Sequence, residues 1–141
     1  MTADEIIAHL SLAPHPEGGF YRQTWVEATD GARATGTSIY FLLKDGAASH
    51  WHRVDAVEIW HYYAGAPLIL SMAADENGPV EDILIGNDLA HGQFPQGIVP
   101  KDHWQAARTT GAYTLVGCTV SPGFQFEGFT LAPPDFSIPN T

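Results

Sequence analysis

Residues 46–65 read Gly46-Ala47-Ala48-Ser49-His50-Trp51-His52-Arg53-Val54-Asp55-Ala56-Val57-Glu58-Ile59-Trp60-His61-Tyr62-Tyr63-Ala64-Gly65. This segment predicts two neighbouring β-strands that carry polar side chains among apolar ones. Because side chains alternate along a strand, we expect His50 and His52 to share one face of the first strand. By the same rule, Glu58, Trp60 and Tyr62 share a face of the second. A hairpin would bring the two faces together, so imidazoles and a carboxylate would meet inside a barrel.

The rest of the chain has the pattern of an antiparallel β protein. Fourteen Gly and ten Pro separate short β-branched and aromatic runs, a spacing typical of a sandwich or barrel. A short helix is expected at about 2–11, where Thr2 and Glu5 can form a capping box. A strap without regular pairing is expected at about 132–141, where prolines interrupt the chain. The predicted strands are 20–26, 36–43, 49–54, 58–63, 67–73, 80–85, 103–107 and 113–120.

Length and charge limit the classes of function. A chain of 141 residues with 45% hydrophobic residues is the size of one domain, 1–141, with a single core. Six Lys and Arg against sixteen Asp and Glu give a net charge of −10, which argues against nucleic acid and anionic membranes as partners. One cysteine and no basic, apolar leader predict a cytoplasmic protein.

Imidazole and carboxylate side chains in one pocket suit two kinds of chemistry. They are ligands for zinc, iron or manganese when at least three donors converge. They also form an acid–base pair when one group reaches a substrate with a suitable pKa. The sequence permits both, and it also permits His50 and His52 to be ordinary structural histidines.

The same segment resembles the first motif of the cupin superfamily. Gly46, His52, Glu58 and Gly65 fall on that motif, whereas Val54 stands where its second histidine belongs. The second cupin motif is matched more loosely, with Pro100, Asp102, Gln105 and Thr109 at its four places. Gln105 stands there in place of the motif histidine.

More specifically, the chain resembles the DUF985 branch of the cupins, also called the cupin-5 family. One signature is His15-Pro16-Glu17-Gly18-Gly19-Phe20-Tyr21-Arg22. The others lie at 38–43, 52–53, 58–65 and 115–124, so the resemblance covers nearly the whole chain. It implies an all-β cupin double-stranded β-helix, a jelly-roll barrel with the short N-terminal helix. It also implies a homodimer, but no settled reaction.

The resemblance leaves an incomplete metal site. Only a set made of His50, His52, Glu58 and Gln105 could hold a divalent Fe, Mn, Ni or Zn ion. An amide oxygen is a poor replacement for imidazole around such a metal. We therefore expect a metal-free pocket rather than a tight native metal.

Metal-free relatives in the wider superfamily include sugar-nucleotide epimerases, which this branch resembles in outline. That chemistry needs a base next to a carbonyl and an acid on the opposite face. We expect His52 to be the base, with Glu58 orienting its other nitrogen and Tyr40 or Tyr62 as the acid.

The binding groups expected beside that pair are Tyr21, Arg22, Trp60, His50 and Gln105. Arg22 or Arg53 would hold a phosphate or carboxylate of the substrate. A surface ion pair is the simpler interpretation of Arg53.

Three functional hypotheses follow. The first is a carbohydrate epimerase or isomerase that binds a small polar, carbohydrate-like metabolite and removes a proton through His52 and Glu58. The second is a non-catalytic module that binds a small ligand with the same residues. The third is a metal-dependent cupin enzyme, such as a phosphosugar isomerase or dioxygenase.

Overall fold

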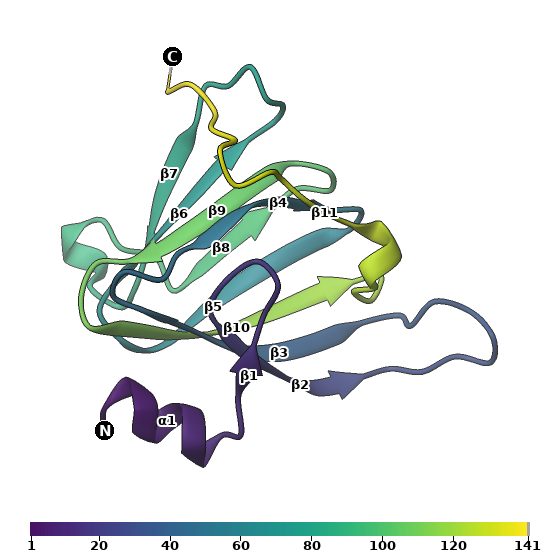
Figure 1. Ribbon diagram of the computed structural model, residues 1–141, viewed down its shortest axis with the longest axis horizontal. Coiled ribbons are helices and arrows are strands. Elements are labelled where there is room, and N and C mark those ends of the chain that lie inside the picture. Colours follow the sequence, from purple (N-terminus) through teal and green to yellow (C-terminus); the bar gives the residue numbers. More distant parts are fainter. Residues whose placement is uncertain (141) are drawn as a thin grey trace.

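The protein is an antiparallel β-barrel of two facing sheets, seen in a computed structural model that describes residues 1–140 (Figure 1). One sheet has six strands in the order β1-β2-β3-β10-β5-β8, and the other has five in the order β11-β4-β9-β6-β7. The strand bounds are β1 Ala13–Pro14, β2 Phe20–Val26, β3 Thr37–Lys44, β4 Ser49–Val54, β5 Val57–Gly65, β6 Leu68–Ala73, β7 Glu81–Ile85, β8 Gln96–Val99, β9 Trp104–Thr109, β10 Tyr113–Ser121 and β11 Phe129–Leu131. The all-β jelly-roll expectation is confirmed.

The eight strands predicted from the sequence are all present, and three short ones are added. The additional strands are β1, β8 and β11, of two, four and three residues. Each is too short to show a periodic pattern of its own. Pairing with a longer neighbour creates them: Phe129 to Leu131, for example, pair with Val54 to His52.

The helix and the two 3-10 turns lie outside the barrel. Helix α1, Ala3–His9, begins at Thr2, which forms the expected capping box with Glu5. Ile6 packs with Leu42 on the outer face of β3, beneath the sheet in Figure 1. The 3-10 turns are η1, Leu89–His91, and η2, Phe126–Gly128. Neither α1 nor the 3-10 turns are long and apolar enough to cross a membrane.

Segment 44–65 does not form a hairpin, which corrects the sequence prediction. Strand β4 pairs with β9 and β11, whereas β5 pairs with β10 and β8. The turn at Asp55-Ala56 therefore carries the chain from one sheet to the other. As a consequence, His52 and Glu58 reach the barrel interior from different sheets.

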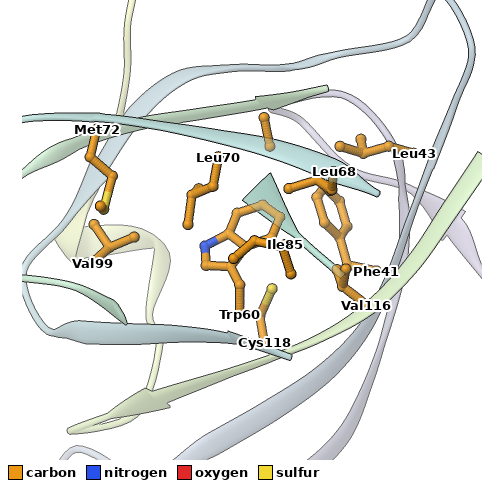
Figure 2. Close-up of a cluster of buried hydrophobic side chains, with 11 residues drawn as sticks. Phe41, Leu43, Trp60, Leu68, Leu70, Met72, Ile85, Val99, Val116 and Cys118 are labelled. Carbon is orange, nitrogen blue, oxygen red and sulfur yellow. The ribbon is translucent and has the colours of Figure 1, made fainter. Parts of the chain in front are cut away.

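One part of the barrel interior is an apolar core. It is centred on Trp60, which is 1% exposed, and includes Phe41, Leu70, Ile85 and Val116 (Figure 2). These side chains come from both sheets and follow the alternation of their strands. A smaller cluster joins Ala73 and Trp104 to Ala132, Phe136 and Ile138, so the C-terminal strap covers one flank of the barrel. The remaining interior space has both polar and apolar walls.

Candidate functional site

A cavity of about 180 Å³ lies inside the barrel beside the apolar core. Its polar walls are formed by His15, Glu17, Tyr21, Gln23, His52 and Glu58. Its apolar walls are formed by Ile39, Val54, Val120, Phe124 and Phe126. His52 and Glu58, the two residues on which the sequence prediction centred, are 1% and 7% exposed and share this cavity.

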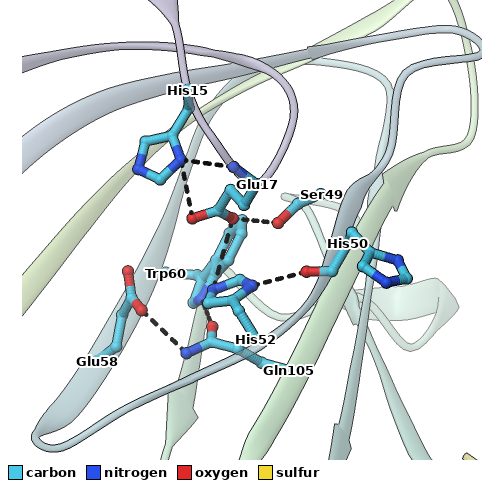
Figure 3. Close-up of polar contacts among 8 residues, drawn as sticks. All are labelled: His15, Glu17, Ser49, His50, His52, Glu58, Trp60 and Gln105. Atoms are coloured by element: carbon cyan, nitrogen blue, oxygen red, sulfur yellow. Dashed lines mark hydrogen bonds and ion pairs between the residues drawn. The ribbon is translucent and has the colours of Figure 1, made fainter. Parts of the chain in front are cut away.

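A β-bulge in β4 decides which of its side chains face inward. The pairing with β9 shifts between Ser49 and His52, so Ser49 and His52 are both buried, each 1% exposed. A bulge adds a residue and interrupts the alternation of sides. The His50 ring consequently points away from the cluster (Figure 3). Its Nε2 lies 2.8 Å from the carbonyl oxygen of Pro133. The expectation that His50 shares a face with His52 is wrong.

The ring of His52 is fixed in one tautomer. Its Nδ1 lies 2.8 Å from the backbone oxygen of His50, which can only accept a hydrogen bond. Nδ1 therefore carries the proton in the neutral ring, and Nε2 has a free lone pair. Nε2 lies 3.5 Å from Oε2 of Glu17. The backbone oxygen, and not Glu58 as expected, orients the imidazole.

Glu17 reaches the cavity from the tight loop before β2. In this loop Gly18 has φ of +107°, and a Cβ there would lie 2.2 Å from the backbone oxygen of Ala48. Only glycine allows so close an approach. The loop is held to β4 by the N–H of His50, which donates to the Glu17 oxygen at 2.8 Å. The Glu17 carboxyl is hydrogen-bonded to the Ser49 hydroxyl.

Glu58 is the end of a hydrogen-bonded chain that two other side chains, Trp60 and Gln105, complete (Figure 3). The indole N–H of Trp60 donates to Oε1 of Gln105 at 2.8 Å. The Gln105 amide therefore presents its NH₂ group to Glu58, and donates to Oε1 of that residue at 3.0 Å. Trp60 and Gln105 do not line the cavity, which corrects their expected role in ligand binding. They position Glu58 instead.

Burial shifts the pKa of each titratable group in this cluster. It raises the pKa of Glu17 to about 8, although the hydrogen bond from Ser49 acts to lower that pKa. It raises the pKa of Glu58 to about 7, opposed chiefly by the nearby His52. Burial, with a smaller effect of His52, lowers the pKa of His15 to about 4. Burial also lowers the pKa of His52, although Glu58 opposes that shift. The cavity thus pairs neutral imidazoles with carboxyl groups that titrate near neutral pH.

The predicted tyrosine acids lie outside the cavity. Tyr40 is on the outer face of β3, in the cluster that packs against α1. Tyr62 packs near the apolar core, and its hydroxyl donates to the Gly65 oxygen at 2.6 Å. Tyr21, by contrast, lines the cavity as expected. Side-chain alternation along β3 explains the outward position of Tyr40, because the next residue, Phe41, points into the core.

The predicted arginines are also on outer surfaces. The guanidinium of Arg22 lies over the Tyr40 ring, 5.6 Å from its centroid. Arg53 lies over Trp104 in the same way, at 4.9 Å. Neither lines the cavity, so the expectation that Arg22 or Arg53 binds an anionic substrate group there is wrong.

The side chains do not form the metal site that a cupin fold suggests. Among residues 1–140, no group of three or more His, Cys, Asp or Glu side chains is placed to hold a metal ion. Of the four expected ligands, His50 points outward and Gln105 uses its amide oxygen to accept from Trp60. His52 and Glu58 alone make a weak donor set. The residues present do not fit the metal.

Sequence reasoning missed Glu17 and Ser49, gave His15 no role, and interpreted Cys118 as a buried small apolar residue rather than a nucleophile. Glu17 and His15 stand in the glycine-rich signature 15–22, which was the available signal. Their Nδ1 and Oε1 atoms lie 3.4 Å apart. Cys118 lines the cavity as a buried thiol, and burial raises its pKa further from the physiological range. It is therefore a neutral wall of the cavity and not a nucleophile.

Comparison with known proteins agrees with the geometry. A family model described as Cupin superfamily (DUF985) matches residues 4–132. The crystal structure of protein SO0799 from Shewanella oneidensis is 41% identical, with a TM-score of 0.88 over 94% of this chain and 85% of that one. A hypothetical protein from Leishmania major is 31% identical, with a TM-score of 0.83 over 94% and 88% of the two chains.

Oxalate decarboxylase from Bacillus subtilis is a more distant neighbour, 15% identical with a TM-score of 0.64 over 84% of this chain and 29% of that one. At that identity it shows the fold alone. No curated protein matches the chain. The family model covers nearly the full length of the chain, and the two relatives share its β-barrel. The chain therefore belongs to the DUF985 family of the cupin superfamily.

Proposed function

We propose that this protein binds a small polar metabolite in the barrel cavity and isomerises or epimerises it by proton transfer next to a carbonyl group. The observation that carries the proposal is the contact between His52 and Glu17. The unprotonated Nε2 of His52 and the Glu17 carboxyl lie 3.5 Å apart on the wall of one cavity. Removal of a proton next to a carbonyl needs a base for that proton and a hydrogen-bond donor for the carbonyl oxygen.

In this mechanism His52 is the base. The bond from hydrogen to the carbon beside the carbonyl breaks, the proton passes to Nε2, and the electron pair moves to the carbonyl oxygen. The backbone oxygen of His50 keeps the lone pair of the imidazole on Nε2. The imidazolium that forms is stabilised by Glu58, whose charge already favours protonation of His52.

Glu17 is the acid. Its pKa of about 8 keeps it protonated at neutral pH, so it can donate a hydrogen bond to the oxygen on which charge develops. A neutral carboxylic acid in an apolar site is an effective donor of this kind. The proton then returns from His52, and the compound is isomerised when the neighbouring carbon receives it. A Glu58 that is protonated at the start can instead give its own proton to the opposite face, which epimerises the compound and leaves Glu58 ionised beside the His52 imidazolium.

The experiment is exchange of solvent deuterium into a panel of small aldoses, ketoses and oxo acids, followed by proton NMR. We expect exchange into at least one compound, and a loss of about 100-fold or more in His52→Gln, in the range that general acid–base groups supply. His91→Gln is the matched control, because His91 is exposed and pairs only with Asp88. A panel without exchange would overturn the catalytic proposal, and binding without exchange would leave a binding module.

A further inference from the structure

The cavity contains two carboxyl groups and no side chain that carries a permanent positive charge. Glu17 and Glu58 are 9% and 7% exposed and reach it from the loop before β2 and from β5. The two histidines beside them, His15 and His52, are held neutral by burial. An anionic group placed here would meet carboxyl groups and would find no partner for its charge.

The six basic side chains of the protein are all placed elsewhere. Arg22 and Arg53 stack on Tyr40 and Trp104, and Arg33 pairs with Asp55 through contacts of 2.7 and 3.1 Å. Lys44 pairs with Asp4, and Lys101 and Arg108 are exposed. None of these side chains lines the cavity. Within the described residues, no basic side chain is therefore placed to neutralise a phosphate or carboxylate group of a ligand.

The cavity walls do suit hydroxyl and carbonyl groups. Oε1 of Glu58 accepts from Gln105, and the Cys118 thiol is also hydrogen-bonded to this carboxyl group. Tyr21, Gln23 and Thr37 add donors and acceptors along the same surface. Phe124 and Phe126, whose ring centroids are 5.1 Å apart, cover another side with apolar surface. A sugar-like compound presents both kinds of surface, hydroxyl groups at its edge and C–H groups on its face.

The volume limits the size of the ligand. A cavity of 180 Å³ equals roughly six water molecules at about 30 Å³ each. It is smaller than the roughly 300 Å³ at which pockets for drug-sized ligands begin. A nucleotide group does not fit inside it, whereas a compound of about six to ten non-hydrogen atoms does.

We propose that the ligand is an uncharged polyhydroxy carbonyl compound of triose to pentose size, without a phosphate, carboxylate or ammonium group. An ammonium group is disfavoured because proton removal by His52 would place an imidazolium next to it in the same cavity. This inference rests on the proposed function for that step. The exclusion of anions rests on the placement of the charged side chains, with the neutral histidines in support.

The test measures binding of three matched probes by NMR titration: glycerol, glycerate and 2-amino-1,3-propanediol. They share a three-carbon frame and differ in charge. We expect glycerol to bind about tenfold or more tightly than either charged probe, the effect of about one uncompensated charged contact. Tighter binding of glycerate or of the amine, or no binding of any probe, would overturn the proposal.

A variant supplies the missing charge. Gln23 lines the cavity from β2 and is exposed at one edge, so Gln23→Arg places a guanidinium there. We expect glycerate affinity to rise about tenfold in Gln23→Arg. It should stay unchanged in the control Gln96→Arg, at an exposed position of β8. Equal glycerate affinity in both variants would contradict the claim that anions are excluded because the cavity has no cationic side chain.

Failure of this inference and failure of the proposed function give different results. A preference for a charged probe together with deuterium exchange would overturn only the charge assignment. A preference for glycerol without exchange into any uncharged sugar would overturn only the catalytic proposal.

Discussion

The Gln105 amide donates to Oε1 of Glu58 across the barrel, from β9 in one sheet to β5 in the other, at 3.0 Å. Gln105 stands at the place where the resemblance to cupins leads one to expect a metal-binding histidine. Here Gln105 positions Glu58 instead. Its amide oxygen accepts a hydrogen bond from Trp60, so its amide nitrogen faces the Glu58 carboxyl group. At a position typical of a metal ligand, Gln105 thus supports the acid–base group Glu58.

Replacing Gln105 by Met should raise the pKa of Glu58 above its value of about 7. The hydrogen bond from Gln105 favours the ionised carboxylate, so its loss favours the protonated form. The measurement is a pH titration of the Glu58 carboxyl carbon by NMR. Gln96→Met on β8 serves as the exposed control, and an unchanged or lower pKa in Gln105→Met would contradict the assigned role.

Stability should fall as pH rises from about 6.5 to about 8. Glu17 and Glu58 have folded-state pKa values of about 8 and 7, above the ordinary value of 4.5, so the folded state binds more protons in this range. The lowered pKa values of His15 and His52 act in the opposite direction. Their effect fades above pH 6.5, the ordinary histidine pKa, because the unfolded histidines then lose their protons as well.

Between these two pH values the free energy of unfolding should fall by about 2 kcal/mol. Each additional proton bound by the folded state changes it by about 1.36 kcal/mol per pH unit. Urea unfolding across this pH range measures it. In Glu17→Gln most of the decline should disappear, whereas the control Glu27→Gln, at an exposed position, should keep it. A wild-type stability that rises over this range would show that the carboxyl groups are ionised in the folded state.

Gly18→Ala should destabilise the protein by about 2 kcal/mol or more, the cost of a strained backbone with a steric clash. The added Cβ would lie 2.2 Å from the Ala48 oxygen, at a φ of +107°. Gly31→Ala is the matched control, because its φ of +68° is also left-handed but nothing lies within 4 Å. Thermal unfolding compares the two variants, and an equal, small effect would mean that the 15–19 loop can move away from β4 without loss.

The purified protein should contain far less than one equivalent of bound transition metal, measured by elemental analysis. The reason is the donor set: His50 points outward, and the Gln105 oxygen is occupied by the Trp60 N–H. His52→Ala should leave the metal content unchanged. Stoichiometric iron, manganese, nickel or zinc that is lost in His52→Ala would contradict this prediction and favour a metal-dependent reaction.

The sequence by itself determined the class of fold and the centre of the site. Short β-branched runs between glycines and prolines predict an antiparallel sandwich or barrel, because the period of two buries one face of each strand. The capping box of α1, the eight longer strands and the shared cavity of His52 and Glu58 all follow from such local patterns and from the family signatures. These features depend on residues that are close in sequence.

Only the tertiary structure decided which other side chains join these two. The bulge in β4 turned His50 out and Ser49 in, and the passage of 44–65 between two sheets placed His52 and Glu58 on different walls. Close packing of Gly18 against Ala48 brought Glu17 to His52. Pairing register, bulges and loop contacts arise from strands distant in the chain, so no local pattern in the sequence carries them.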